Sequence, residues 1–179
     1  MTFTTIRAAA LCLFALTGPA LAGDDDCAQV HSKLTFCGGE QVWSPMEAGK
    51  TEGVAMFRNS GESFGKVIVE KVTPGQVSRE QIENAILTDL VIKQGDEDGR
   101  FTVDSLDGGK VDGEIVGNLS YSIPGRTKPL NLLHSYLVRG DLLIQFITIT
   151  ANGIGDGNAR NLHKDFLGSF RITADAPLL

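Results

Sequence analysis

The stretch that decides the fold is LNLLHSYLVRGDLLIQFITIT, residues 130–150. It contains two β-prone runs, 130–138 and 142–150, and the Gly140-Asp141 pair between them is a tight connection typical of a β-hairpin. The second run is apolar at almost every position, which is typical of a central strand covered on both faces. We therefore expect a hairpin whose second arm lies inside a sheet.

The chain before and after this hairpin contains further strand and turn signals. Residues 66–72 alternate between two faces, one with Val67 and Val69 and the other with Ile68 and Glu70. The polar stretch 44–53, SPMEAGKTEG, contains Pro and two Gly, so it is predicted to be a loop. Other strands are predicted over residues 34–37, 54–58, 101–103 and 114–123.

Two helices are predicted from periodic apolar residues. Ser78 and Gln81 form a capping-box pair at the start of the first helix, which should end at Gly95. The second helix should begin at Asn158 after a glycine-rich turn. The apolar stripes consist of Ile82, Ile86 and Leu90 in the first helix and of Leu162, Phe166 and Phe170 in the second.

Length and composition fit an ordinary globular protein. The chain has 179 residues, of which 42% are hydrophobic, and its 16 Lys and Arg against 22 Asp and Glu give a net charge of −6. A nucleic-acid partner requires a basic surface, so this balance argues against one. The composition and the absence of a linker predict a single domain over residues 23–179.

The first 22 residues have the pattern of a secretory signal peptide. Arg7 precedes the apolar run 8–16, and a Gly-Pro breaker then leads to small residues at Ala20 and Ala22. The apolar run is about half of the roughly 20 residues that a membrane-spanning helix needs. We expect cleavage after Ala22 and a soluble periplasmic or secreted protein with no membrane span in the mature chain.

Export gives the remaining cysteines a structural interpretation. Cys27 and Cys37 are the two cysteines left after cleavage, and disulfides persist in an oxidising compartment. A redox pair prefers C-x-x-C, and a structural zinc site needs two closely spaced pairs, whereas this spacing is C-x9-C. We expect a disulfide that ties the mature N-terminus to the first strand.

Residues 61–65, GESFG, fit the nucleophile elbow G-x-S-x-G of α/β-hydrolases. One alternative function is therefore a small serine hydrolase that uses Ser63, with Asp89 and either His134 or His163 in the chain order of a triad. The elbow requires a strand-to-helix turn, but the residues after Ser63 are strand-forming. We expect a polar hairpin turn here and no catalytic residue.

Residues 95–113 are rich in Gly and Asp, and a second alternative is a calcium or small-ligand site in this segment. Its acids are Asp96, Glu97, Asp98, Asp104, Asp107 and Asp112. An EF-hand loop starting at Asp96 needs an oxygen ligand at its fifth position and Gly at its sixth, where this chain has Arg100 and Phe101. Solvated carboxylates are the expected state, with no metal and no cofactor.

The three histidines show no metal-ligand spacing in the sequence. His31 lies near the mature N-terminus, His134 lies on a predicted strand and His163 on the last predicted helix. We expect His163 to be a partly exposed helix residue without a chemical role.

Several segments together resemble the PsbP/DcrB-like superfamily. They are the helix SREQIENAILTDLVIKQG, the strand pair YLVRGDLLIQFITIT and the terminal FLGSFRI, within residues 34–172. The chain departs from the family at the front, where GGEQVWSP stands in place of a Pro-Gly-Trp-like turn. The resemblance implies an α+β fold with an antiparallel β-sheet flanked by helices on both faces, an α/β/α sandwich.

The resemblance also implies a role, since this fold serves as extrinsic photosynthetic subunits, periplasmic proteins and secretion or transport accessories. No binding residue of the family maps onto this sequence. We therefore expect an exported, non-catalytic binding or accessory protein that contacts a protein or envelope component. The loops 95–113 and 151–157 are the candidate contact surface, because loops on a rigid scaffold often carry recognition.

Overall fold

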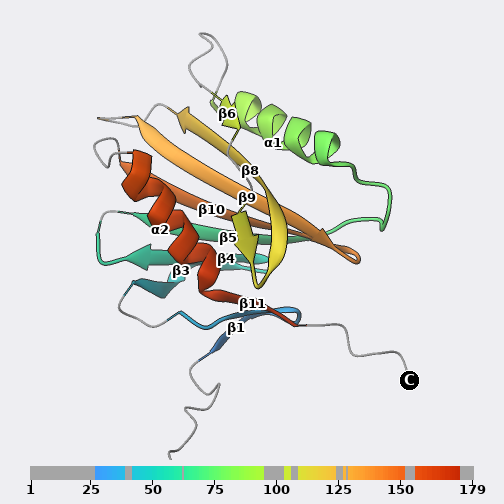
Figure 1. The fold of residues 1–179 in the computed structure, drawn as a ribbon, viewed down its shortest axis with the longest axis horizontal. Coiled ribbons are helices and arrows are strands. Elements are labelled where there is room, and N and C mark those ends of the chain that lie inside the picture. The colour runs from blue at the N-terminus through green and yellow to red at the C-terminus, as the bar shows by residue number, and fades with distance from the viewer. Residues whose placement is uncertain are drawn as a thin grey trace, which may run out of the picture.

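The computed structural model describes residues 27–38, 42–61, 63–94, 103–105, 109–123, 127, 129–151 and 156–173 (Figure 1). Residues 1–22, the predicted signal peptide, lie outside them. In chain order the elements are β1 (Ala28–His31), β2 (Leu34–Phe36), β3 (Trp43–Thr51), β4 (Val54–Asn59), β5 (Phe64–Lys71), α1 (Arg79–Gln94), β6 (Val103–Ser105), β7 (Gly109–Val111), β8 (Glu114–Ile123), β9 (Leu130–Arg139), β10 (Leu142–Ala151), α2 (Asp156–Gly168) and β11 (Phe170–Ile172).

The expected hairpin is confirmed, and its second arm is a central strand. Strands β9 and β10 are antiparallel, with Leu142 opposite Arg139, and β10 pairs with β5 on its other side. Gly140 has a φ of 61° in the connecting turn, a conformation that glycine adopts without strain. The eight-stranded sheet runs β3-β4-β5-β10-β9-β8-β6, with β7 paired to β8, and its pairings are antiparallel.

Alternation along β10 creates two separate cores. Ile144 and Phe146 are fully buried in the core that contains Phe166 of α2. Leu143 and Ile147 lie in the other core, together with Ile82 and Ile86 of α1. Successive side chains of a strand point to opposite faces, so α1 and α2 pack against opposite faces of the large sheet.

A small sheet, β1-β2-β11, covers part of the α2 face. Phe36 of β2 and Phe170 of β11 pack with Phe57 of β4 in the α2-side core, with ring centroids 4.7–5.5 Å apart. Cys27 and Cys37 lie at disulfide-bonding distance beside the β1–β2 pair, which supports the expected cross-link.

The α+β class with antiparallel sheets is confirmed. In the described part of the chain, one helix packs on each face, and the α2 face is shared with the small sheet. Neither of these helices has the length and apolarity needed to cross a membrane.

Two sequence-based expectations are wrong. Residues 44–53 are predicted to be a loop, but most of them belong to β3, because Ser44, Pro45, Met46 and Thr51 pair with β4 and Trp43 is buried. Pro45 is tolerated because β3 is an edge strand of the sheet. Phe170 does not continue the stripe of the last helix, since α2 ends at Gly168 and Phe170 lies on β11, although it enters the same core as Phe166.

Other predicted elements agree within a few residues. The first helix has its predicted capping box, in which Gln81 N donates to Ser78 Oγ (3.2 Å) and Ser78 N donates to Gln81 Oε1 (2.8 Å). Of its predicted stripe, Ile82 and Ile86 are buried, and the side chain of Leu90 lies outside the described residues. The strand predicted over 101–103 is β6, displaced toward the C-terminus.

Gly117 of β8 is expected to be intolerant of a side chain. Tyr136 lies opposite it in the register, and an added Cβ would overlap the Tyr136 ring. The substitution Gly117→Ala should lower the free energy of unfolding by about 1–3 kcal/mol, the usual cost of overpacking. The control is Gly157→Ala in α2, where nothing lies within 4 Å of the added carbon. Equal denaturation midpoints for the two variants would contradict this packing.

Candidate functional site

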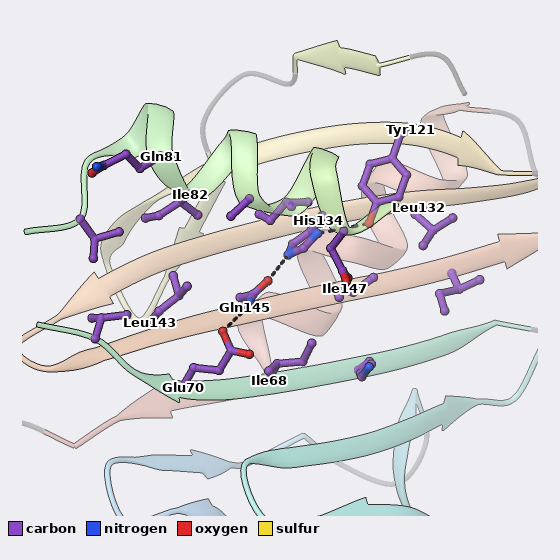
Figure 2. Close-up of a pocket in the computed structure, with 17 residues that line it drawn as sticks. Ile68, Glu70, Gln81, Ile82, Tyr121, Leu132, His134, Leu143, Gln145 and Ile147 are labelled. Atoms are coloured by element: carbon purple, nitrogen blue, oxygen red, sulfur yellow. Dashed lines mark hydrogen bonds between the residues drawn. The ribbon is translucent and has the colours of Figure 1, made fainter. Parts of the chain in front are cut away.

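A pocket of about 620 Å³ lies between α1 and the sheet (Figure 2). We call it the α1 pocket. Its apolar walls include Ile82 and Ile86 from α1, and Ile68, Leu132, Leu143 and Ile147 from β5, β9 and β10. Pockets of a few hundred Å³ with apolar walls and a few polar groups are typical of small-molecule sites.

A line of four polar side chains crosses the floor of the α1 pocket. Tyr121 Oη lies 3.2 Å from His134 Nδ1, and His134 Nε2 lies 2.9 Å from Gln145 Oε1. The Gln145 amide then donates to Glu70 Oε2 at 3.1 Å. Figure 2 shows the last two bonds as dashed lines running from His134 through Gln145 to Glu70. We call these four residues the polar line.

The strand register explains how the polar line forms. The residue opposite His134 is Ile147, and the residue opposite Gln145 is Tyr136, so His134 and Gln145 are diagonal neighbours on one face. Such neighbours lie close enough for long side chains to meet. Tyr121 stands in the same relation to His134, as Glu70 does to Gln145, so the line crosses β8, β9, β10 and β5.

The negative charge of Glu70 determines which group donates and which accepts in each hydrogen bond of the polar line. An ionised carboxylate only accepts hydrogen bonds, so the Gln145 NH₂ group faces Glu70 and the Gln145 oxygen faces His134. His134 Nε2 must then carry the ring hydrogen, which leaves Nδ1 to accept from the Tyr121 hydroxyl. All three bonds therefore donate toward the Glu70 end.

Burial keeps the line in this state near neutral pH. The pKa of His134 is lowered to about 4, chiefly by burial; the Gln145 bond acts to raise it, and the positive charge of Lys66 acts to lower it. Burial, together with the Asp89 charge, raises the pKa of Tyr121 above its usual range. Neither group changes its charge near pH 7.

A hydrogen bond from Tyr136 of β9 ties the first turns of α1 to the sheet. Tyr136 Oη donates to Glu83 Oε1 at 2.5 Å, and Arg79 Nε donates to the same oxygen at 2.8 Å. Burial acts to raise the pKa of Glu83, but these two bonds outweigh it and lower that pKa overall. Gly117 leaves the space in which the Tyr136 ring lies.

A second histidine network lies on the opposite face of the sheet. His163 Nε2 is 2.7 Å from Ser135 Oγ, and His163 Nδ1 is 2.9 Å from Thr148 Oγ1. Ser135 in turn donates to Asn118 Oδ1. His163 is only 5% exposed, so the expectation of a partly exposed residue is wrong, and burial lowers its pKa to about 3. The members of this network are buried, which makes it part of the core and not an accessible site.

The structure does not bring the predicted hydrolase residues together. Ser63 is 2% exposed and lies between β4 and β5, a strand-to-strand connection as the sequence predicted. Asp89 and His134 line the α1 pocket, but Ser63 does not. Both ring nitrogens of His134 and of His163 contact residues other than Ser63.

The acidic segment is described only in part. Asp96, Glu97, Asp98 and Asp107 lie outside the described residues, as do residues 152–155 of the second candidate loop. Asp104 lies on β6, and Asp112 Oδ2 accepts a bond from the Ile172 backbone N–H at 3.0 Å. Over the described ranges, no three His, Cys, Asp or Glu side chains gather as a metal site would require.

Sequence reasoning missed Glu70 and Gln145 as site residues. The alternation of 66–72 placed Glu70 on the correct face with Ile68, and Gln145 is the one strongly polar side chain in the run 142–147. A polar residue within a buried strand needs a partner, and that requirement is the signal that could have pointed to this site.

The topology and the packing of this structure define a PsbP-like fold. The structure is similar to the solution structure of cyanobacterial PsbP (CyanoP) from Synechocystis sp. PCC 6803, with a TM-score of 0.54 and 18% identity over 78% of this chain and 86% of that chain. A crystal structure from Bacteroides thetaiotaomicron VPI-5482 gives a TM-score of 0.48 and 9% identity over 79% of this chain and 46% of that chain. No protein-family model matches the sequence, and neither does any curated protein.

The two buried histidines should make the protein less stable in mild acid. Their pKa values lie below the ordinary 6.5, so the unfolded state binds more protons as the pH falls from 6.5. Above pH 6.5 the two histidines should make the free energy of unfolding no more dependent on pH than it is without them. Between pH 6.5 and about pH 4.5 the free energy of unfolding should fall by roughly 1 kcal/mol per pH unit for each histidine. Urea denaturation of the wild type and of His163→Gln measures this slope, which should be shallower in the variant. Identical slopes in the two proteins would contradict the lowered pKa of His163.

Proposed function

We propose that this protein is an exported, non-catalytic accessory protein that binds a small amphipathic ligand in the α1 pocket. The observation that carries the proposal is a pocket of about 620 Å³ with apolar walls and a single polar line across its floor. The walls suit the apolar part of a ligand, and the exposed end of the line at Glu70 suits its polar part.

The chemistry of the polar line favours binding over catalysis. A general base needs a free nitrogen and a pKa near the working pH. His134 has partners on both ring nitrogens, and its pKa is about 4. The hydrolase alternative has no support in the geometry around Ser63, whose neighbouring elements are strands.

The accessory role includes contact with a protein or envelope component, and we propose the loops 95–113 and 151–157 as that surface. The PsbP-like fold supports an accessory role by analogy alone. By the same analogy we propose that α1 and α2 correspond to the helical layers of an α/β/α sandwich. Export is supported by the Cys27–Cys37 pair, since disulfides persist outside the cytoplasm.

The pocket can be tested with N-phenyl-1-naphthylamine, a neutral apolar fluorophore. We expect saturable binding to the wild type with a rise in fluorescence. Ile68 lines the pocket and is only partly buried, so Ile68→Trp should fill the pocket and weaken binding about tenfold or more, equivalent to about 1.4 kcal/mol.

The matched control for this variant is Val138→Trp. Val138 is 40% exposed on β9 and does not line the pocket, so this variant should bind the fluorophore like the wild type. Melting temperatures of both variants would show that they are folded. Absence of saturable binding to the wild type, or equal loss in both variants, would refute the proposed function.

Export has a separate test. When the full chain is produced in a bacterium, the mass of the protein in the periplasmic or secreted fraction should correspond to a chain that begins at Gly23. Ala22→Arg removes the small residue that the signal peptidase requires, so the uncleaved chain should accumulate. A mature mass that includes residues 1–22 in the wild type would refute the expected cleavage.

A further inference from the structure

We propose that the ligand of the α1 pocket carries a protonated amine, which the Glu70 carboxylate binds, on an apolar chain that lies between α1 and the sheet. The proposal deepens the proposed function and rests on it. Two sources share this chemistry, namely an alkyl amine and an apolar peptide with a free amino terminus.

Glu70 has unused hydrogen-bonding capacity. A carboxylate has about four acceptor positions, and in the described part of the chain Gln145 supplies the one hydrogen bond that Glu70 accepts. No lysine or arginine of the described residues forms an ion pair with it. Glu70 is also exposed at the pocket, so its remaining oxygen positions can accept bonds from a ligand.

The hydrogen bonds of the polar line all run in one direction, toward Glu70. Tyr121, His134 and Gln145 each direct a proton toward the next member, and the series ends on Glu70. The Gln145 bond therefore holds the carboxylate in place without neutralising its charge. The exposed end of the polar line is therefore a hydrogen-bond acceptor, the Glu70 carboxylate. A protonated amine is a suitable partner for this acceptor.

The charges in the pocket lining also favour a cationic ligand. Among the lining residues that the structure describes, Lys66 is the one cation, whereas Glu70 and Asp89 are both acidic. Lys66 lies four residues before Glu70 on β5, roughly 13 Å along an extended strand, so its charge is displaced from an amine bound at Glu70. His134 adds no positive charge near neutral pH, since its pKa is about 4. The balance therefore favours a cationic head group over an anionic one.

An apolar surface lies beside Glu70. Leu143 lies opposite Glu70 in the register, and Ile147 and Ile149 follow on the same face of β10. From Leu143 to Ile149 the strand extends roughly 20 Å. Ile82 and Ile86 of α1 form the facing wall. An amine bound at Glu70 therefore places an attached apolar chain along this wall.

The test compares octylamine, octanol and octanoate by displacement of N-phenyl-1-naphthylamine from the exported protein, at pH 7 and low salt. Octylamine is protonated at this pH. We expect it to bind about threefold to tenfold more tightly than octanol, because an exposed ion pair adds modest affinity. Octanoate should bind more weakly than octanol.

Two variants that each remove one charge test whether the ligand amine binds Glu70. Glu70→Gln keeps an acceptor for Gln145 but removes the charge, so octylamine should fall to the affinity of octanol, while octanol should be unchanged. Lys66→Met removes the competing cation, so it should leave octylamine binding unchanged or tighter. Melting temperatures verify that both variants are folded, which the exposed and partly buried positions favour.

A tri-leucine amide, which has a free amino terminus and no carboxylate, distinguishes the two sources. If the tri-leucine amide binds more tightly than octylamine, the ligand is assigned as a peptide. If it binds more weakly, the ligand is assigned as an alkyl amine. In both cases binding should require Glu70. The proposal is overturned if octylamine binds no better than octanol, if Glu70→Gln leaves its affinity unchanged, or if octanoate binds best and Lys66→Met weakens it. In these cases saturable binding of the fluorophore still supports the proposed function, which is refuted only by absence of that binding in the wild type or by its equal loss in Ile68→Trp and Val138→Trp.

Discussion

The structure depends on one strand, β10, that must bury side chains on both of its faces. Its even-numbered apolar residues, such as Ile144 and Phe146, enter the α2-side core, and its odd-numbered residues, such as Leu143 and Ile147, enter the α1-side core. A slip of one residue would exchange the two sets, so the register with β9 and β5 is strongly specified. The two faces of β10 therefore belong to different cores, one that contains Phe166 of α2 and one that contains Ile82 and Ile86 of α1.

The polar residues of β10 show how the two faces differ. Thr148 and Gln145 interrupt the apolar pattern on opposite faces, and each contacts a histidine, His163 and His134 respectively. A buried polar group without a partner costs on the order of 1–3 kcal/mol, so both networks are needed for the strand to be central. On the α2 face the network is enclosed by the core. On the α1 face the helix leaves a pocket, and the network there continues to the exposed Glu70.

Sequence patterns predicted the parts of this fold that depend on local signals. The hairpin connection, the alternation of β5 and the capping box at Ser78 are each contained within a few residues, and the structure has all three. The strand β3 was missed because its stability comes from pairing with β4 and from burial of Trp43, neither of which appears in the local composition. The site was missed for the same reason. Its four polar residues are spread over positions 70–145 and meet only because four strands are in register.

The polar line also explains why a histidine is suited to a site that does not need proton transfer. A neutral imidazole has one donor and one acceptor on opposite sides of a rigid ring. His134 on β9 can therefore accept a hydrogen bond from Tyr121 and donate one to Gln145. With a pKa of about 4, His134 stays neutral under ordinary conditions, and the direction of the line does not reverse. The Gln145 amide therefore keeps its NH₂ group toward Glu70. Because the carboxylate accepts a bond from a neutral donor and forms no ion pair with a lysine or arginine of the described residues, it is the group that we propose to bind the ligand at the mouth of the pocket.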